Sequence, residues 1–267
     1  MISLTQLAIY PVKSTAQISL DTADISPFGL SMDRRWMIID SNGQMLTQRK
    51  YANMCLIKSA ISNNTLTLSA PAMPPLTLPL NISASEHPAQ LKATVWNDTC
   101  NAYNCGTEAA GWLSDFLNTP ARLVFFPQHE IRQVDLTYAR TGDTTAFSDG
   151  FPYLLITQAS LDDLNSRLTT PVEMKRFRPN LVVSGTVAFA EDSWKKIRIG
   201  DTLFNVVKPC SRCAIPGINP QTAEKTAEPL KTLAGYRLRD NNIYFGQNVI
   251  AEGSGVLTVG MEVEVLE

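Results

Sequence analysis

The stretch Lys196-Ile-Arg-Ile-Gly-Asp-Thr-Leu-Phe-Asn-Val-Val207 decides the fold class of this chain of 267 residues. Its first part alternates polar and apolar residues, Gly200-Asp201 indicates a turn, and a second apolar run follows, which is typical of two short strands. The tail Gly255-Val-Leu-Thr-Val-Gly-Met-Glu-Val-Glu-Val265 alternates in the same way. Short strands spaced in this manner favour a closed or nearly closed β-barrel.

The first half of the chain also predicts strands, paired in hairpins. Asn42-Gly43 separates two apolar runs, and Asn63-Asn64 separates another two, so each dipeptide indicates a hairpin turn. A further strand pair is expected within 91–104. Helices are predicted at about 107–118 and 158–168, with Thr107 and Thr157 as N-caps. The fold class is therefore mainly β with α/β elements, and Thr119-Pro120 suggests a division into 1–118 and 119–267.

Composition excludes several classes of function. The net charge is −2, from 23 basic and 25 acidic residues, so no global field attracts nucleic acid or an anionic membrane. No apolar run approaches the roughly 18 residues that suggest a spanning helix. The amino terminus, Met1-Ile-Ser-Leu-Thr-Gln-Leu7, lacks the features of a signal peptide, and we expect a cytoplasmic protein. An anionic ligand must be held by a local cluster of Lys and Arg.

Five cysteines, at 55, 100, 105, 210 and 213, argue against a disulfide framework, and two of them form the sharpest local motif, Lys208-Pro-Cys-Ser-Arg-Cys213. Prolines 216 and 220 follow, so a thioredoxin-like site at a helix N-terminus is disfavoured. A four-cysteine zinc site with Cys100 and Cys105 and simple burial of both thiols remain alternatives. Lys208 and Arg212 favour thiolate, which is the form that ligates metals.

Polar residues gather where other predicted strands begin or end. Lys13 and Ser14 close the first strand, Arg34 precedes the first hairpin, and two further clusters contain Ser148-Asp149 and Arg178 with Asn180. Taken singly, each is explained by a solvated charge, a surface ion pair or a turn. Together, a thiolate and several cations suit a polyanionic cofactor that bears a metal.

This combination resembles the MOSC superfamily, and closely its branch of mitochondrial amidoxime-reducing components (mARC) and YcbX-type bacterial proteins. The resemblance covers essentially the whole chain, and it implies an N-terminal MOSC-associated β-barrel-like domain at 1–118 and a MOSC β-barrel domain at 119–267. The matching motifs are Pro11-Val-Lys-Ser14, Asp33-Arg34, Ser148-Asp149, Ala159-Ser-Leu-Asp-Asp-Leu-Asn165, Phe177-Arg-Pro-Asn180, Glu191-Asp-Ser-Trp194, Cys210-Ser-Arg-Cys213, Glu228-Pro-Leu-Lys231 and Phe245-Gly-Gln247.

The resemblance implies a molybdenum cofactor of the molybdopterin type, with the second cysteine, Cys213, as the ligand of molybdenum. It implies that Asp149 lies beside the metal as a catalytic residue that relays protons or orients the substrate. The implied reaction is the two-electron reduction of N-hydroxylated compounds such as amidoximes, hydroxylamines and N-hydroxylated base analogues. The residues implied to bind the cofactor are Lys13, Ser14, Arg34, Ser148, Arg178, Asn180, Ser211, Arg212 and Gln247.

Two departures from the family pattern matter. Ala214-Ile-Pro-Gly217 replaces hydroxyl residues that often follow the cysteine pair, and the chain stops at Glu267 without a ferredoxin domain. We therefore expect a separate electron donor, a ferredoxin or a flavoprotein reductase. The alternatives are a sulfur carrier or transferase with a persulfide on Cys213, and a non-catalytic cofactor-binding protein. Pyridoxal phosphate is not expected on this chain.

Histidines add little. His87 is assigned no role, and His129 is best explained as an exposed loop residue. The polar segment at about 127–146 is long for a connection, either a substrate-facing loop or a mobile one.

Overall fold

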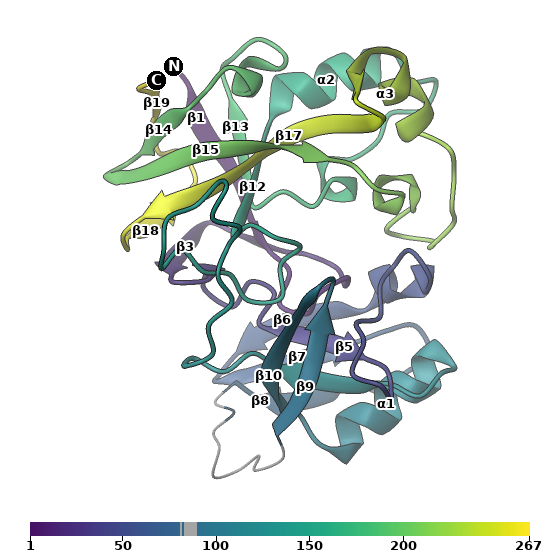
Figure 1. Ribbon diagram of the computed structural model, residues 1–267. Coiled ribbons are helices and arrows are strands. Elements are labelled where there is room, and N and C mark those ends of the chain that lie inside the picture. Colours follow the sequence, from purple (N-terminus) through teal and green to yellow (C-terminus); the bar gives the residue numbers. More distant parts are fainter. Residues whose placement is uncertain (81, 83–89) are drawn as a thin grey trace.

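A curved nine-stranded sheet forms the upper part of the molecule, and smaller sheets form the lower part (Figure 1). The computed structural model describes residues 1–80, 82 and 90–267, so His87 lies outside the described residues. The large sheet has the order β19-β14-β15-β17-β12-β13-β1-β2, and β16 pairs with β17. Its strands are β1 (Ser3–Ile9), β2 (Ile18–Leu20), β12 (Tyr153–Thr157), β13 (Leu181–Ser184), β14 (Lys196–Ile199), β15 (Thr202–Ser211), β16 (Leu238–Arg239), β17 (Asn242–Glu252) and β19 (Val263–Val265).

The sheet curls until β1 meets the segment beside β19, which confirms the predicted closed or nearly closed barrel. Ser3 of β1 bridges Glu262 beside β19, and the Leu4 amide donates to the Met261 carbonyl over 2.9 Å. The two chain termini consequently lie side by side (Figure 1). Buried apolar side chains fill the interior. The decisive stretch contributes Ile197, Ile199 and Phe204, and other strands contribute Leu4, Leu7, Leu155, Leu181 and Val249.

The smaller sheets come mostly from the first half of the chain. They have the orders β5-β11-β10-β9, β6-β7-β8 and β18-β3-β4. Because β1 and β2 join the barrel sheet and β3 pairs with β18, the first thirty residues lie with the carboxy-terminal half in space. The strands are β3 (Thr22–Ser26), β4 (Gly29–Leu30), β5 (Trp36–Ile39), β6 (Lys58–Ser62), β7 (Thr65–Ser69), β8 (Leu76–Pro79), β9 (Gln90–Val95), β10 (Asp98–Asn104), β11 (Arg122–Phe125) and β18 (Val256–Thr258).

The predicted hairpins are present, with one shorter than expected. Asn63 and Asn64 adopt left-handed φ angles of 48° and 61° between β6 and β7, which is the turn that asparagine favours. Around Asn42-Gly43, Ile39 and Met45 form only an isolated bridge, because β5 pairs mainly with β11. Pairing of β5 with β11 therefore limits the local hairpin at this turn to one bridge.

Three α-helices are present among the described residues: α1 (Thr107–Leu117), α2 (Gln158–Ser166) and α3 (Leu230–Arg237). The predicted cap of α2 is confirmed, since the Thr157 hydroxyl accepts from the Ser160 amide. The predicted cap of α1 is wrong, because the N-cap position is Gly106 and no side chain caps it. Helix α3 was not predicted, and it buries few apolar side chains. Short 3-10 helices are η1 (Ala52–Leu56), η2 (Met174–Arg176), η3 (Ala190–Asp192) and η4 (Ile215–Gly217).

Thr157→Ala is expected to lower the free energy of unfolding by about 2 kcal/mol, because a helix cap is lost and a buried carboxylate loses a donor. The Thr157 hydroxyl lies 2.8 Å from an oxygen of Glu191, which is fully buried. Urea denaturation measures the change, and Thr169→Ala, at an exposed loop position, is the control. Equal stability of the two variants would refute this structural role.

Candidate functional site

A cavity of about 120 Å³ opens between the barrel and the loops beside it, and it collects most of the residues that the sequence singled out. Ten of the eleven site residues predicted from the sequence line it, whereas Gln247 does not. They come from segments far apart in the chain, which only the fold brings together. The ten are Lys13, Ser14, Arg34, Ser148, Asp149, Arg178, Asn180, Ser211, Arg212 and Cys213.

Three of these residues adopt backbone conformations that non-glycine residues rarely occupy. The φ angles of Ser14, Arg34 and Arg178 are 68°, 47° and 59°, all in the left-handed region. Each costs about 1 kcal/mol or more, and such strain collects at binding sites and active sites. The turns aim these side chains at the cavity at the expense of local stability.

Tyr10 separates two arginines of the site, a role that sequence reasoning missed. The guanidinium carbons of Arg34 and Arg178 each lie 4.1 Å from the centre of its ring. The phenol is buried and donates to the Pro179 carbonyl over 3.1 Å, and burial raises its pKa to about 12. Burial lowers the pKa of Arg178 to about 10, so this arginine remains charged at neutral pH. The aromatic ring holds two like charges close together.

Lys13 and Asp149 form an ion pair at the cavity. The buried Lys13 ammonium donates to the Phe147 carbonyl over 2.8 Å and to Asp149 Oδ1 over 2.6 Å. The Asp149 side chain is 67% exposed toward the cavity. Burial raises the pKa of Asp149, but the Lys13 charge and the bonds from Lys13 and Trp96 outweigh it and hold that pKa well below its usual range. Asp149 is therefore a carboxylate at neutral pH.

The cysteine pair lies at the end of β15, where the strand is irregular. Its register with β17 shifts between Val206 and Lys208 and again between Pro209 and Ser211. Pro209 has no amide hydrogen, and bulges of this kind redirect side chains beside active sites. Cys210 and Cys213 are both half-buried and line the cavity. A single turn, η4, follows them, so the expected absence of an α-helix there is confirmed.

Lys208 and Arg212 were both expected to act on the cysteines, but their side chains lie in different places. Arg212 Nη1 donates to the Cys210 sulfur over 3.1 Å, and Nη2 donates to the Phe177 carbonyl over 2.6 Å. Lys208 instead stacks on the Tyr138 ring, with its nitrogen 4.3 Å from the ring centre. Of the two cations, Arg212 is therefore the one that contacts the cysteine pair, at Cys210.

Several buried polar atoms at the cavity have no partner in the described part of the chain. They are Ser148 Oγ, the Tyr153 hydroxyl and Arg212 Nε. Buried polar groups are nearly always paired, so three unpartnered atoms in residues of one cavity lining are unusual. The two hydroxyls can donate or accept a hydrogen bond, whereas the guanidinium nitrogen can only donate.

Gln247 belongs to a neighbouring network. Its amide donates to Asp192 Oδ1 over 2.7 Å, and Asp192 Oδ2 accepts from Arg237 over 2.6 Å. Because side chains alternate along β17, the next residue, Asn248, lines the cavity in its place. His129 is exposed and lies beside the Tyr103 ring, outside the cavity lining.

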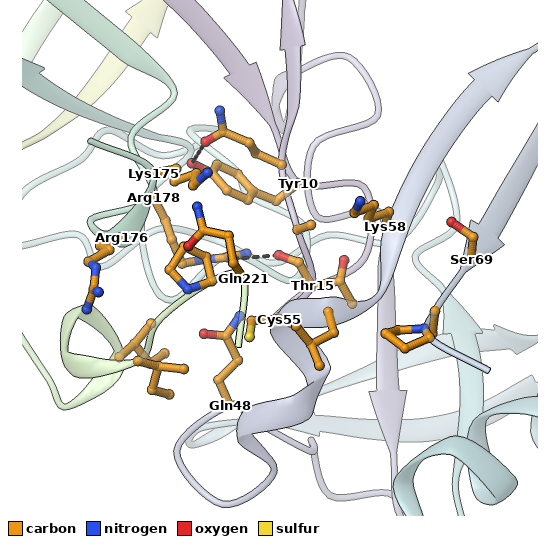
Figure 2. Close-up of a pocket in the computed structure, with 18 residues that line it drawn as sticks. Tyr10, Thr15, Gln48, Cys55, Lys58, Ser69, Lys175, Arg176, Arg178 and Gln221 are labelled. Atoms are coloured by element: carbon orange, nitrogen blue, oxygen red, sulfur yellow. Dashed lines mark hydrogen bonds between the residues drawn. The ribbon is translucent and has the colours of Figure 1, made fainter. Parts of the chain in front are cut away.

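A second, larger cavity of about 700 Å³ adjoins the first, and Arg178 and Ile215 line both. Figure 2 shows it between η1 on one side and the segment of Lys175, Arg176 and Arg178 on the other. Arg178 Nη1 donates to the Thr15 carbonyl over 2.6 Å across this space. No sequence motif had indicated the polar residues that line it, which include Gln48, Lys58, Lys175, Arg176 and Gln221.

The zinc alternative is wrong for the described residues. Cys105 packs in the apolar cluster around Trp36, whereas Cys100 packs in a separate cluster. Burial raises the pKa of Cys100 to about 11, which disfavours the ligating thiolate. Throughout the described part of the chain, no three His, Cys, Asp or Glu residues are grouped as a metal site requires.

Comparison with known proteins identifies the family to which the chain belongs. Residues 1–120 match the family described as MOSC N-terminal beta barrel domain, and residues 142–264 match the MOSC domain. The chain belongs to the MOSC family, as the sequence resemblance predicted.

Within this family the chain groups with the mitochondrial amidoxime-reducing components. It is 38% identical to mitochondrial amidoxime-reducing component 1 of Mus musculus, over 99% of this chain and 82% of that protein. The human protein of the same name is 37% identical, over 99% of this chain and 83% of its own length. A molybdenum cofactor sulfurase of Danio rerio is 32% identical, over 91% of this chain and 31% of its own length. These relatives define a molybdenum-cofactor-related reductase family.

None of the described helices has the length and apolar character needed to cross a membrane. The amidoxime-reducing relatives carry the word mitochondrial in their names, and the cytoplasmic location expected from the sequence stays a prediction.

Proposed function

We propose that this chain binds the molybdenum cofactor in the two joined cavities and reduces N-hydroxylated compounds, with the Cys213 thiolate as the ligand of molybdenum. The observation that carries the proposal is the cavity itself, whose lining combines a half-buried thiol with the buried Lys13 and the half-buried Arg34, Arg178 and Arg212. The relationship to amidoxime-reducing components supports the same reaction class.

The residues present fit this cofactor. A soft thiolate suits molybdenum, while arginine and lysine suit the anionic phosphate of molybdopterin. Arg212 Nε, Ser148 Oγ and the Tyr153 hydroxyl, in three residues that line the small cavity, have hydrogen-bonding capacity that the described residues leave unused. The larger cavity, with several cations and polar amides, has room for the organic part and phosphate of the cofactor. Arg178 lines both spaces and links the two ends of the proposed site.

When bound, the cofactor supplies the two electrons that cleave the N–O bond. The chain itself orients the substrate and sets its electrostatic surroundings. Asp149 is a carboxylate held at Oδ1 by Lys13, and it can accept a hydrogen bond from the N–H or O–H of an amidoxime. Because the pKa of Asp149 is low, orienting the substrate is a better role for it than donating a proton at neutral pH.

Arg178→Gln is expected to lower retention of the cofactor about tenfold or more, because a charged donor shared by both cavities is lost. The measurement is the pterin content of purified protein, read from the fluorescence of the oxidised pterin. Arg167→Gln is the matched control, since that arginine pairs with Asp163 on the surface of α2. Equal pterin content in the two variants would remove Arg178 from the proposed site.

The reaction is tested by reducing an amidoxime with cofactor-loaded protein and a chemical reductant. Turnover to the amidine is expected, and its absence from protein with a full cofactor load would overturn the proposed activity. The natural electron donor, proposed to be a separate ferredoxin or flavoprotein reductase, is not needed in this assay.

A second candidate is a sulfur carrier with a persulfide on Cys213, and the similarity to the Danio rerio sulfurase favours keeping it. This function predicts that cyanide releases sulfur from Cys213 and that amidoximes are not reduced. A non-catalytic cofactor-binding protein predicts bound cofactor without either activity.

A further inference from the structure

The tip of the β9–β10 hairpin carries a residue that the turn does not favour. Val95 pairs with Asp98, so Trp96 and Asn97 form a two-residue loop. Trp96 has a left-handed φ of 54° at the first loop position, where two-residue hairpins favour glycine, asparagine or aspartate. A bulky side chain at such a φ is strained, so formation of the hairpin does not explain the tryptophan.

The hairpin tip is fixed to the edge of the small cavity by two contacts. Trp96 Nε1 donates to Asp149 Oδ1 over 3.1 Å. Asp98, at the start of β10, accepts from Arg132 Nε over 2.7 Å. Arg132 is buried and donates to the Ser148 carbonyl over 2.6 Å. The indole therefore has a defined place beside the carboxylate of the proposed site.

Trp96 keeps an exposed ring surface, unlike the other tryptophans. Its exposed fraction is 38%, whereas Trp36, Trp112 and Trp194 are at most 7% exposed. The Arg49 guanidinium lies over the ring, 4.3 Å from its centre, which holds the ring in one orientation. An exposed and oriented indole at a cavity rim is suited to stacking against a flat ligand.

The size of the small cavity makes such a rim surface useful. Its volume is about 120 Å³, and the proposed cofactor takes part of that space. The N-hydroxylated group of an aromatic amidoxime can enter the space that the cofactor leaves, while its ring stays at the rim. Asp149 reaches into the cavity and also bonds Trp96, so a substrate held by Asp149 has its ring near the indole.

We propose that Trp96, with Arg49 stacked on it, forms an aromatic shelf that binds the flat part of the substrate and selects planar aromatic N-hydroxylated compounds. The inference rests on the proposed reductase function and adds to it a substrate class and a specificity-determining residue. Aromatic amidoximes and N-hydroxylated bases fit the shelf, whereas small aliphatic amidoximes do not reach it.

Kinetics with two substrates test the shelf. Trp96→Ala is expected to raise KM for benzamidoxime about tenfold, the loss of one aromatic stacking contact, and to change KM for acetamidoxime less than about twofold. Trp96→Phe, which keeps a ring but loses the N–H donor, should remain within about threefold of wild type for both. Val187→Ala, at an exposed residue away from the cavity lining, is the surface control.

The result that overturns the shelf is an equal loss for both substrates in Trp96→Ala and Trp96→Phe, which would mean that Trp96 acts only through its bond to Asp149. No change for benzamidoxime in Trp96→Ala overturns it as well. Trp96→Gly guards against misfolding, because the turn favours glycine: its melting temperature should be no lower than that of Trp96→Ala, with the same loss toward benzamidoxime.

Fluorescence tests the same contact without turnover. With excitation of tryptophan, benzamidoxime should quench wild-type protein and should leave Trp96→Phe unchanged, while acetamidoxime should quench neither. Equal quenching of wild type and Trp96→Phe would overturn the shelf. If wild-type protein binds benzamidoxime at Trp96 but reduces neither amidoxime, the reductase function fails and the binding surface stands.

Discussion

Cys213→Ala is expected to lower the rate of amidoxime reduction by at least about 100-fold, because the variant loses the only bond between the protein and the metal that we propose. Removal of an outer partner of a metal ligand already costs about 10–100-fold, so loss of the ligand itself should cost more. Cys210→Ala is expected to lose less than about tenfold, since the Cys210 sulfur accepts from Arg212. The measurement is kcat with chemical reductant for both variants.

The comparison separates the two cysteines although both line the cavity. If Cys210→Ala loses as much activity as Cys213→Ala, the pair acts as a unit, and the assignment of a single ligand is refuted. Circular dichroism of both variants checks that each remains folded.

Asp149→Asn is expected to lower kcat for acetamidoxime about 100-fold, with the content of molybdenum unchanged, because misplacement of a substrate by about 1 Å can cost about that much. The amide can still accept a hydrogen bond from Lys13, so the loss reports the negative charge and not the fold. Asp24→Asn, at an exposed position of β3, is the control.

Full activity of Asp149→Asn at every pH, with unchanged metal loading, would remove Asp149 from the mechanism. The low pKa of Asp149 sets a further expectation: the wild-type carboxylate stays ionised as the pH falls through the usual range for aspartate. Its contribution should therefore not be lost between about pH 5 and pH 4, where an ordinary aspartate begins to protonate.

The fold class was predictable because local pattern and tertiary structure agree in the barrel. Ile197, Ile199 and Phe204 alternate in the sequence and all point into the same core. The α1 cap was not predictable in this way, since Gly106 holds the position without any side-chain bond and Thr107 only resembles a cap. Helix α3 lacks the apolar stripe that identifies a helix, and only Leu233 is buried within it.

Some residues of the candidate site were likewise predictable from the sequence, and others were not. Lys13, Asp149 and Arg178 were found because each follows or precedes an apolar strand and matches a family motif. Tyr10 and Trp96 were not found, because an aromatic residue in a strand or hairpin looks like ordinary core or surface until its neighbours are known. Lys58 and Lys175 of the larger cavity lie far apart in the chain, and only the packing of the two halves brings them together.

Gln247 shows the opposite case, a motif residue whose side chain the fold turns toward Asp192. A shift of one residue along β17 exchanges the two faces of the strand, so a motif match alone cannot decide between Gln247 and Asn248. The pocket geometry places Asn248 at the cavity, while the role of Gln247 in cofactor binding stays a prediction.

The most direct test of cofactor binding through Cys213 is elemental analysis of protein expressed with molybdate, comparing wild type with Cys213→Ala. We predict about one molybdenum per wild-type chain and less than about a tenth of that in the variant, because loss of a ligand weakens metal retention strongly. Equal molybdenum in the two proteins would contradict the assignment of Cys213.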